Sequence, residues 1–173
     1  MADLTLRLVI GYGNTIRQDD GLGYRVAERL TDQPPSLSFC RFKAIAVHQL
    51  TPDLGAEVAE ATEVIFVDMA LATQMDRSSN SPVSPINSST QNPSVQLQRL
   101  SPGEQTTLGH MSNPQHILQL SDRLFGKAPQ GYWLLIPGEW CDLGEEFSPL
   151  AQAGFSQALA IVQTPNLETL CSK

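Results

Sequence analysis

Residues 6–23 read LRLVIGYGNTIRQDDGLG. The apolar run Leu6–Ile10 predicts a strand, and Leu22–Leu30 has apolar residues at helical spacing. A glycine-rich loop with two adjacent carboxylates, Asp19 and Asp20, joins the strand to the helix. In open α/β sheets, binding sites form beyond the carboxyl ends of strands. The stretch therefore predicts an α/β fold with a candidate site directly after the first strand.

The same alternation of strands and helices continues along the chain. Val64–Val67 is wholly apolar, as expected of a strand in a sheet that is covered on both faces. Three further helices are predicted to begin with a capping residue followed by proline at the first helical position. The further strands are predicted at residues 39–47, 64–67, 95–100 and 131–136, and these helices at 51–61, 113–125 and 148–162. The pattern predicts one α/β domain over residues 1–173, with helices on both faces of a five-stranded sheet.

Residues 72–96 differ in composition from the rest of the chain. Of these 25 residues, 18 are Ser, Thr, Asn, Gln or Pro. Such a stretch cannot bury enough apolar surface to order itself, so we interpret it as a low-complexity insertion in the domain.

Composition excludes several functional classes. The chain has 173 residues, with 18 acidic and 11 basic side chains and a net charge of −7, which argues against nucleic acid or an anionic membrane as the main partner. The three cysteines are widely spaced and include no Cys-x-x-Cys pair, as is typical of free thiols in a reducing compartment. No apolar stretch is long enough to span a bilayer, and the N-terminus lacks a secretory pattern. We expect a soluble, cytoplasmic protein.

Three side chains are predicted to meet at one edge of the sheet. Asp20 follows the first strand, Asp68 ends the third, and His110 precedes the helix capped at Asn113. Two carboxylate oxygens and one imidazole nitrogen form a three-ligand site for Zn²⁺ or Ni²⁺ that leaves positions open to water or substrate. The alternatives are that Asp19 or Asp20 caps a helix, that Asp68 forms a turn at the strand end, and that His110 is a surface residue.

Other motifs carry weaker signals. Gly11-Tyr12-Gly13 resembles the start of a dinucleotide fingerprint, but Ile16 replaces the third glycine and the two carboxylates would repel a pyrophosphate. His48 is interpreted as a loop residue after the second strand, and His116 as a residue in the first turn of its helix. Glu139 is interpreted as a solvated loop acid, with contact to the substrate as the alternative. No thiol nucleophile is assigned.

Taken together, these residues resemble the [NiFe]-hydrogenase maturation proteases. The resemblance rests on LVIGYGN at residues 8–14, DDGxG at 19–23, the strand ending in Asp68, and His110, and it runs along the chain apart from residues 72–96. Residues 48–54, HQLTPDL, and the stretch from His110 to Leu120 resemble the branch that serves bidirectional, NAD-linked hydrogenases, as in cyanobacteria.

The resemblance implies an activity, a partner and a site. Members of this family are endopeptidases that remove a C-terminal peptide from the hydrogenase large-subunit precursor after nickel insertion. Asp20, where the family often has Glu, would contact the metal together with Asp68 and His110, and Asp19 would be a neighbouring carboxylate available as a base. The nickel would be supplied by the substrate, with another divalent metal such as zinc as the alternative. The implied fold is a three-layer α/β/α domain with a twisted, mostly parallel sheet, and a monomer is expected.

Two other functions stay open at this point. A non-catalytic assembly factor could use the same three ligands to bind a metallated precursor without cutting it. Peptidyl-tRNA hydrolases also begin with a strand followed by Gly-x-Gly-Asn, but they need a basic surface for tRNA, and a net charge of −7 has the wrong sign.

Overall fold

A computed structural model describes residues 5–75, 94–101 and 113–171 of the chain. Its strands are β1 (Leu6–Tyr12), β2 (Arg41–Val47), β3 (Glu63–Leu71), β4 (Gln96–Leu100) and β5 (Gln130–Gly138). Its α-helices are α1 (Leu22–Asp32), α2 (Leu54–Glu60), α3 (Ala72–Met75), α4 (Pro114–Phe125) and α5 (Pro149–Ile161). Two short 3₁₀ helices, η1 (Gln18–Gly21) and η2 (Leu167–Leu170), complete the described elements.

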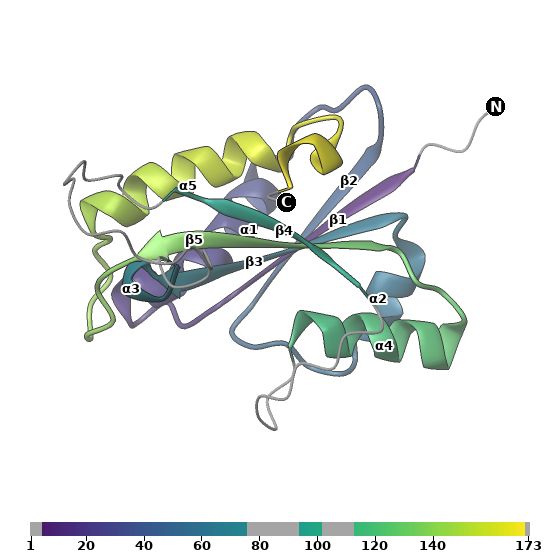
Figure 1. Ribbon diagram of the computed structural model, residues 1–173, viewed down its shortest axis with the longest axis horizontal. Coiled ribbons are helices and arrows are strands. Elements are labelled where there is room, and N and C mark those ends of the chain that lie inside the picture. Colours follow the sequence, from purple (N-terminus) through teal and green to yellow (C-terminus); the bar gives the residue numbers. More distant parts are fainter. Residues whose placement is uncertain (1–4, 76–93, 102–112, 172–173) are drawn as a thin grey trace, which may run out of the picture.

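The strands form one five-stranded sheet in the order β2-β1-β3-β5-β4. Its strands pair in parallel except for the edge strand β4, which runs antiparallel to β5. Helices α1 and α5 pack on one face and α2 and α4 on the other (Figure 1). The predicted three-layer α/β/α domain with a mostly parallel sheet is confirmed.

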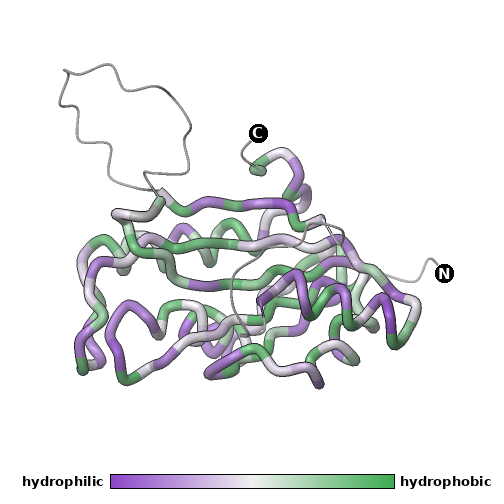
Figure 2. The backbone as a smooth tube through the Cα atoms, turned by 60° about the horizontal axis from the view of Figure 1, so that its bottom comes forward, coloured by the Kyte–Doolittle hydropathy of each residue, from purple (hydrophilic) through white to green (hydrophobic). Residues whose placement is uncertain are grey.

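The two sides of the sheet carry two separate hydrophobic clusters. Val9, Ile65 and Val67 point toward α1 and α5, whereas Leu8 and Phe66 point toward α2 and α4. Residues 64–67 are fully buried because both faces are covered, as their apolar sequence predicted. Figure 2 shows the hydrophobic stretches along the central strands and hydrophilic stretches in the outer loops and helices.

A buried arginine ties the last helix to the first strand. The Arg7 side chain, 1% exposed, forms a salt bridge with Glu63 on β3. Its guanidinium also donates to the carbonyl oxygens of Val162 at 2.8 Å and Thr164 at 2.7 Å, just after α5. These bonds hold the end of α5 against the amino end of the sheet.

Several predicted boundaries need correction. β3 does not end at Asp68: it continues to Leu71, because residues 68–71 keep pairing with β5 through Gly138. β2 begins at Arg41, so Phe39 lies before the strand. The helix predicted to begin at residues 51 and 52 begins at Leu54, because the carbonyls of those two residues accept from backbone N–H groups three positions on and form a tight turn.

The predicted insertion is described only at its two ends. Residues 72–75 form the one-turn helix α3, and β4 begins at Gln96, whereas residues 76–93 lie outside the described residues. No helix in the described ranges is long and apolar enough to cross a membrane.

Candidate active site

Close packing of glycines brings the first loop onto the ends of β1 and β3. A side chain on Gly23 would place its Cβ 2.2 Å from the Val67 carbonyl oxygen, so α1 can begin directly against β3 only with glycine there. Gly13 has a φ of 142°, and a Cβ on it would lie 2.0 Å from the Asp20 carbonyl oxygen. These glycines therefore serve to bring Asp20 beside the carboxyl ends of the central strands, which accounts for them without a nucleotide.

Asp68 lies partly buried on β3, within electrostatic reach of Asp20. The backbone N–H of Met69 donates to Asp68 Oδ1 over 2.8 Å, inside a continuous strand, so the predicted strand-end turn is wrong. Burial raises the pKa of Asp68 to about 6, opposed by hydrogen bonds from the Tyr12 hydroxyl and the Met69 N–H, and the charge of Asp20 raises the pKa further. The two carboxylates therefore influence each other electrostatically at this edge of the sheet.

Tyr12 is a site residue that sequence reasoning overlooked. Its hydroxyl bonds to the Asp68 carboxylate, and burial together with that negative charge raises the tyrosine pKa, which keeps the phenol a neutral donor. The alternation of side chains along a strand could have identified it. Residue 12 lies on the same face of the sheet as Ile10, and residue 68 lies on the same face as Phe66, so both side chains point to one side.

A cavity of about 470 Å³ opens beside Asp68. Its lining includes side chains from β3, α3, β4 and β5: Asp68, Met69, Met75, Gln96, Gln98 and Trp133. A carboxyl group with a pKa near 6 inside such a cavity can both contact a cation and accept a proton near neutral pH.

The third predicted ligand, His110, lies outside the described residues. Within the described ranges, His, Cys, Asp and Glu side chains form no group of three or more that could hold a metal ion. Asp20 and Asp68 are linked only through the effect of the Asp20 charge on Asp68, and the three-ligand site stays a prediction.

Asp19 has a different role from the predicted one. Its side chain is fully buried, and its carboxylate accepts three backbone N–H groups, from Glu139 at 2.8 Å, Trp140 at 3.0 Å and Ser148 at 2.8 Å. Neither η1 nor α1 has a side-chain cap, so the capping interpretation of Asp19 and Asp20 is wrong. Asp19 instead holds the segment that follows β5.

The loop after β1 and the loop after β5 are joined along their length. We call residues 13–18 and 139–147 the paired loops. The Gln18 N–H donates to the Gly144 carbonyl over 2.9 Å, the Gly144 N–H donates to the Ile16 carbonyl over 3.0 Å, and the Arg17 guanidinium donates twice to the Cys141 carbonyl. Figure 1 shows the paired loops at the end of the sheet where β5 ends and α5 begins.

Cys141 lies on the paired loops within electrostatic reach of Asp20. Partial burial and the carboxylates of Asp20 and Asp19 raise the pKa of its thiol. The thiolate is therefore disfavoured near neutral pH, in agreement with the assignment of no thiol nucleophile.

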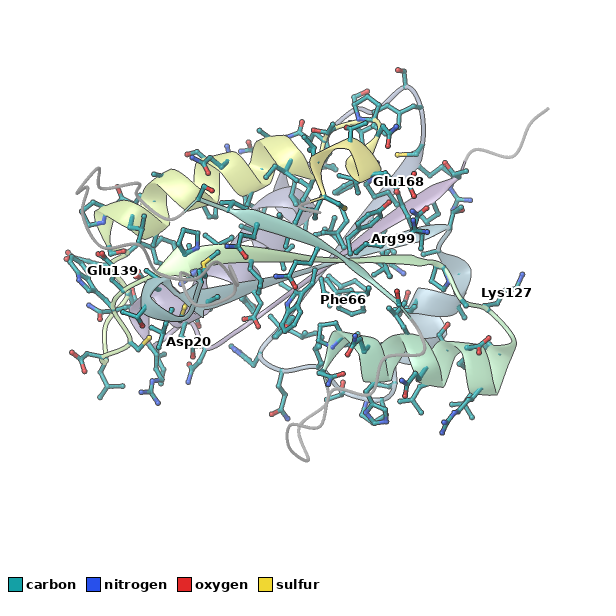
Figure 3. The ribbon with its side chains drawn as sticks, in the orientation of Figure 1. Asp20, Phe66, Arg99, Lys127, Glu139 and Glu168 are labelled. Atoms are coloured by element: carbon teal, nitrogen blue, oxygen red, sulfur yellow. The ribbon has the colours of Figure 1, made fainter. Side chains whose placement is uncertain are left out.

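The remaining candidates lie where the sequence placed them. His48 follows β2 and stacks on the ring of Tyr24, with centroids 5.0 Å apart. His116 is exposed in the first turn of α4. Glu139 is exposed, lies at the same end of the molecule as Asp20 (Figure 3), and borders a second cavity, of about 530 Å³, beside the first turns of α5.

Comparisons with known proteins identify the fold. No family model and no curated protein matches the sequence. Among solved structures, the [NiFe] hydrogenase maturation protease HycI from Thermococcus kodakarensis KOD1 aligns with a TM-score of 0.62 and 16% identity over 96% of this chain and 95% of that chain. The hydrogenase maturating endopeptidase HybD from E. coli aligns with a TM-score of 0.57 and 18% identity over 89% and 87% of the two chains. HybD from T. kodakarensis aligns with a TM-score of 0.59 and 18% identity over 96% and 99%.

At these identities the likeness demonstrates a shared fold over nearly the whole length of each chain. It does not extend to individual side chains, so the chemistry of this chain has to be argued from its own residues.

Proposed function

We propose that this chain is an endopeptidase that removes a C-terminal extension from the nickel-loaded large-subunit precursor of a [NiFe] hydrogenase. The observation that carries the proposal is the partly buried Asp68, which lines a cavity at the carboxyl edge of the sheet and feels the charge of Asp20. The likeness of the whole fold to proteins described as hydrogenase maturation proteases supports it.

In this proposal the metal is part of the substrate. Asp20 and Asp68, completed by His110, would contact nickel already seated in the precursor, with another divalent ion such as zinc as the alternative. Bound nickel would supply Lewis acidity toward the scissile carbonyl or its attacking water. Carboxylate oxygen and imidazole nitrogen form a mixed donor set that suits such an ion and leaves positions for the substrate.

The chain's own residues would then orient the site and move the proton. Tyr12 donates to Asp68 and so fixes the direction of that carboxylate. The Asp68 carboxylate would accept a proton from the attacking water and would then transfer this proton to the leaving amine as the peptide bond breaks. Asp19 is fully occupied by three backbone donors, which leaves Asp68 as the better candidate base.

Three further properties are the type of hydrogenase that the protein serves, its oligomeric state and its location in the cell. We propose that the precursor belongs to a bidirectional, NAD-linked hydrogenase, on the strength of the HQLTPDL stretch at residues 48–54. We also propose that the protein acts as a cytoplasmic monomer, with no nucleic acid or membrane as partner. Its net charge of −7 supports the exclusion of nucleic acid.

The decisive experiment compares two forms of one precursor. Purified protein is incubated with nickel-loaded and with nickel-free large-subunit precursor, and the released C-terminal peptide is measured by mass spectrometry. We expect release from the nickel-loaded form alone. Equal release from both forms would contradict recognition of nickel, and tight binding without release would favour a non-catalytic assembly factor.

Substitutions at the site test the assigned residues. Asp20→Asn, Asp68→Asn and His110→Ala are each expected to lower the rate of processing at least 100-fold, because each removes a donor from the metal or the reacting water. Asp122→Asn, an exposed carboxylate on α4, is the matched control and is expected to process at the wild-type rate. Wild-type processing in all three site variants would remove these residues from the mechanism.

A further inference from the structure

Three exposed hydrophobic side chains gather on the paired loops. Among the described residues, Ile16 is 58% exposed, Trp140 is 42% exposed and Leu143 is 81% exposed. We call these three residues the apolar rim. The other large exposed hydrophobic residues in the described ranges lie on α4 and η2. Because backbone hydrogen bonds join the two loops, these exposed apolar residues lie near one another along the chain's surface, as is typical of an interaction site.

The backbone beneath the apolar rim is held by interactions from both sides. Ile16 accepts a hydrogen bond through its carbonyl oxygen from Gly144, the residue after Leu143, and Trp140 accepts one from the Asp19 N–H over 3.1 Å. The buried Asp19 carboxylate also accepts the Trp140 N–H. Since this backbone is already ordered, a partner would bind without a further entropic cost for fixing the loops, and a preorganised surface binds more tightly than a flexible one.

The apolar rim borders the candidate active site. Ile16 precedes Asp20 by four residues on the same loop, and Cys141, directly after Trp140, lies close enough to Asp20 for that carboxylate to raise its pKa. Figure 3 shows Asp20 and Glu139 at one end of the molecule and Lys127 at the opposite end. A partner seated on the rim would therefore reach the carboxylate pair.

The charge around the apolar rim defines the partner's chemistry. The second of the paired loops carries four exposed acidic side chains and no basic one: Glu139, Asp142, Glu145 and Glu146. The basic residue of the first loop, Arg17, is tied to the Cys141 carbonyl. A complementary partner surface has an apolar depression ringed by lysine and arginine side chains.

We propose that the apolar rim is the docking surface for the folded hydrogenase large-subunit precursor, which meets it with an apolar depression ringed by basic side chains. This inference rests on the proposed function. The rim supplies affinity for the folded body of the substrate, separate from the contacts that Asp20 and Asp68 make at the metal. Trp140 and Leu143 are the anchors, because aromatic and large apolar side chains at the centre of an interface carry most of its binding energy.

The test measures binding and cleavage of the same precursor. Equilibrium binding of nickel-loaded precursor is measured by biolayer interferometry with wild-type protein, Leu143→Asp and Trp140→Ala, and peptide release is followed in parallel. We expect each substitution to raise Kd and KM by roughly tenfold or more, the usual effect of losing an interface anchor, with kcat within about threefold of wild type. Glu146→Lys is expected to slow association, and added salt is expected to slow the association of wild type.

Leu124→Asp is the matched control. Leu124 is 67% exposed and lies in the last turn of α4, three residues before Lys127 at the far end of the molecule. We expect it to leave Kd and KM within twofold of wild type. Thermal unfolding of each variant shows whether a loss of binding reflects a loss of fold.

The outcomes separate the two proposals. If wild type cleaves the precursor while Leu143→Asp and Trp140→Ala bind it as tightly as wild type, the docking surface is wrong and the proposed function stands. If wild type binds without cleaving and the rim variants bind weakly, the docking surface stands and the endopeptidase is wrong. If wild type neither binds nor cleaves the precursor, both are overturned, because the rim then lacks the partner assigned to it.

Discussion

At the scale of single residues, the two neighbouring aspartates of the first loop do opposite things. Asp19 is fully buried, and its carboxylate accepts hydrogen bonds from three backbone N–H groups, whereas Asp20 is partly exposed near Asp68. A buried carboxylate is tolerated only when its oxygens are bonded, so Asp19 belongs to the framework. Asp20 keeps its oxygens available for a ligand.

Replacing Asp19 tests its role in the framework. Asp19→Ala leaves three backbone N–H groups without their acceptor, and we expect it to lower the free energy of unfolding by roughly 3–5 kcal/mol. Asp142→Ala, an exposed acid on the same pair of loops, is expected to change it by less than about 0.5 kcal/mol. Urea denaturation measures both, and an Asp19→Ala variant as stable as Asp142→Ala would contradict this role.

The raised pKa of Asp68 makes stability depend on pH with a definite sign. The folded pKa of about 6 exceeds the ordinary value of 3.8, so the neutral carboxyl is favoured in the folded state. This contribution is fully present below about pH 4 and is lost as pH rises through 6. We therefore expect Asp68→Asn, which is always neutral, to be more stable than wild type at pH 7.5, by up to about 3 kcal/mol.

The measurement is urea unfolding of metal-free protein between pH 4.5 and 7.5, with a chelator present. The advantage of Asp68→Asn over wild type should shrink steadily as pH falls from 7 to 4.5. A difference that stays constant across this range would show that Asp68 ionises in the folded protein with its ordinary pKa.

At the scale of elements, the start of a helix was predictable where a side chain caps its first turn. Asn113 caps α4 by accepting from the His116 N–H, and Ser148 caps α5 by accepting from the Ala151 N–H, each followed by proline, as the sequence predicted. The third signal, Thr51-Pro52, precedes a turn instead, and α2 begins at Leu54 without a side-chain cap. A capping pattern marks a possible start, and packing of the following residues selects the actual one.

Strand ends depend on the partner strand rather than on the strand's own sequence. Asp68 is the first polar residue after four apolar ones, which indicated an end to the strand. β3 continues because β5 beside it extends to Gly138 and its backbone groups need partners. Asp68 therefore projects from within a strand, which holds it more rigidly than a loop would.

The junction of β1, β3 and the end of α5 provides a prediction at this scale. Arg7→Met leaves Glu63 without its buried partner and removes the donors to Val162 and Thr164. We expect a loss of roughly 3–5 kcal/mol in the free energy of unfolding. Arg99→Met breaks an exposed pair with Glu168 and is expected to cost less than about 1 kcal/mol. Thermal and urea unfolding of the two variants should separate them clearly, and equal effects would contradict the burial argument.

At the scale of the whole molecule, charge separates this chain from proteins that bind nucleic acid. With 18 acidic and 11 basic side chains, the molecule repels a phosphate backbone. We expect no measurable binding of tRNA by fluorescence anisotropy at physiological ionic strength, and no release of the peptide from a peptidyl-tRNA. Binding that weakens steeply with added salt would reopen the peptidyl-tRNA hydrolase alternative.

The architecture was predictable from the residues alone. Apolar runs of strand length, helical spacing between them and proline-flanked caps predict a mostly parallel sheet between helix layers. The sequence also predicted that Asp20 and Asp68 lie at the same edge, because parallel strands bring their carboxyl ends to one edge of the sheet. These features follow from local periodicity and chain direction, which each segment carries in its own residues.

Features that depend on residues far apart in the chain became visible only in the folded molecule. Asp19 is a framework residue because its carboxylate accepts hydrogen bonds from the backbone of Glu139 and Trp140, about 120 residues away in the sequence. Tyr12 became a partner of Asp68, and the loops that carry Ile16 and Leu143 came together, through contacts between distant segments. Burial, pKa and exposure are properties of the packed whole, so a side chain's neighbours, rather than its type or spacing, assign its role.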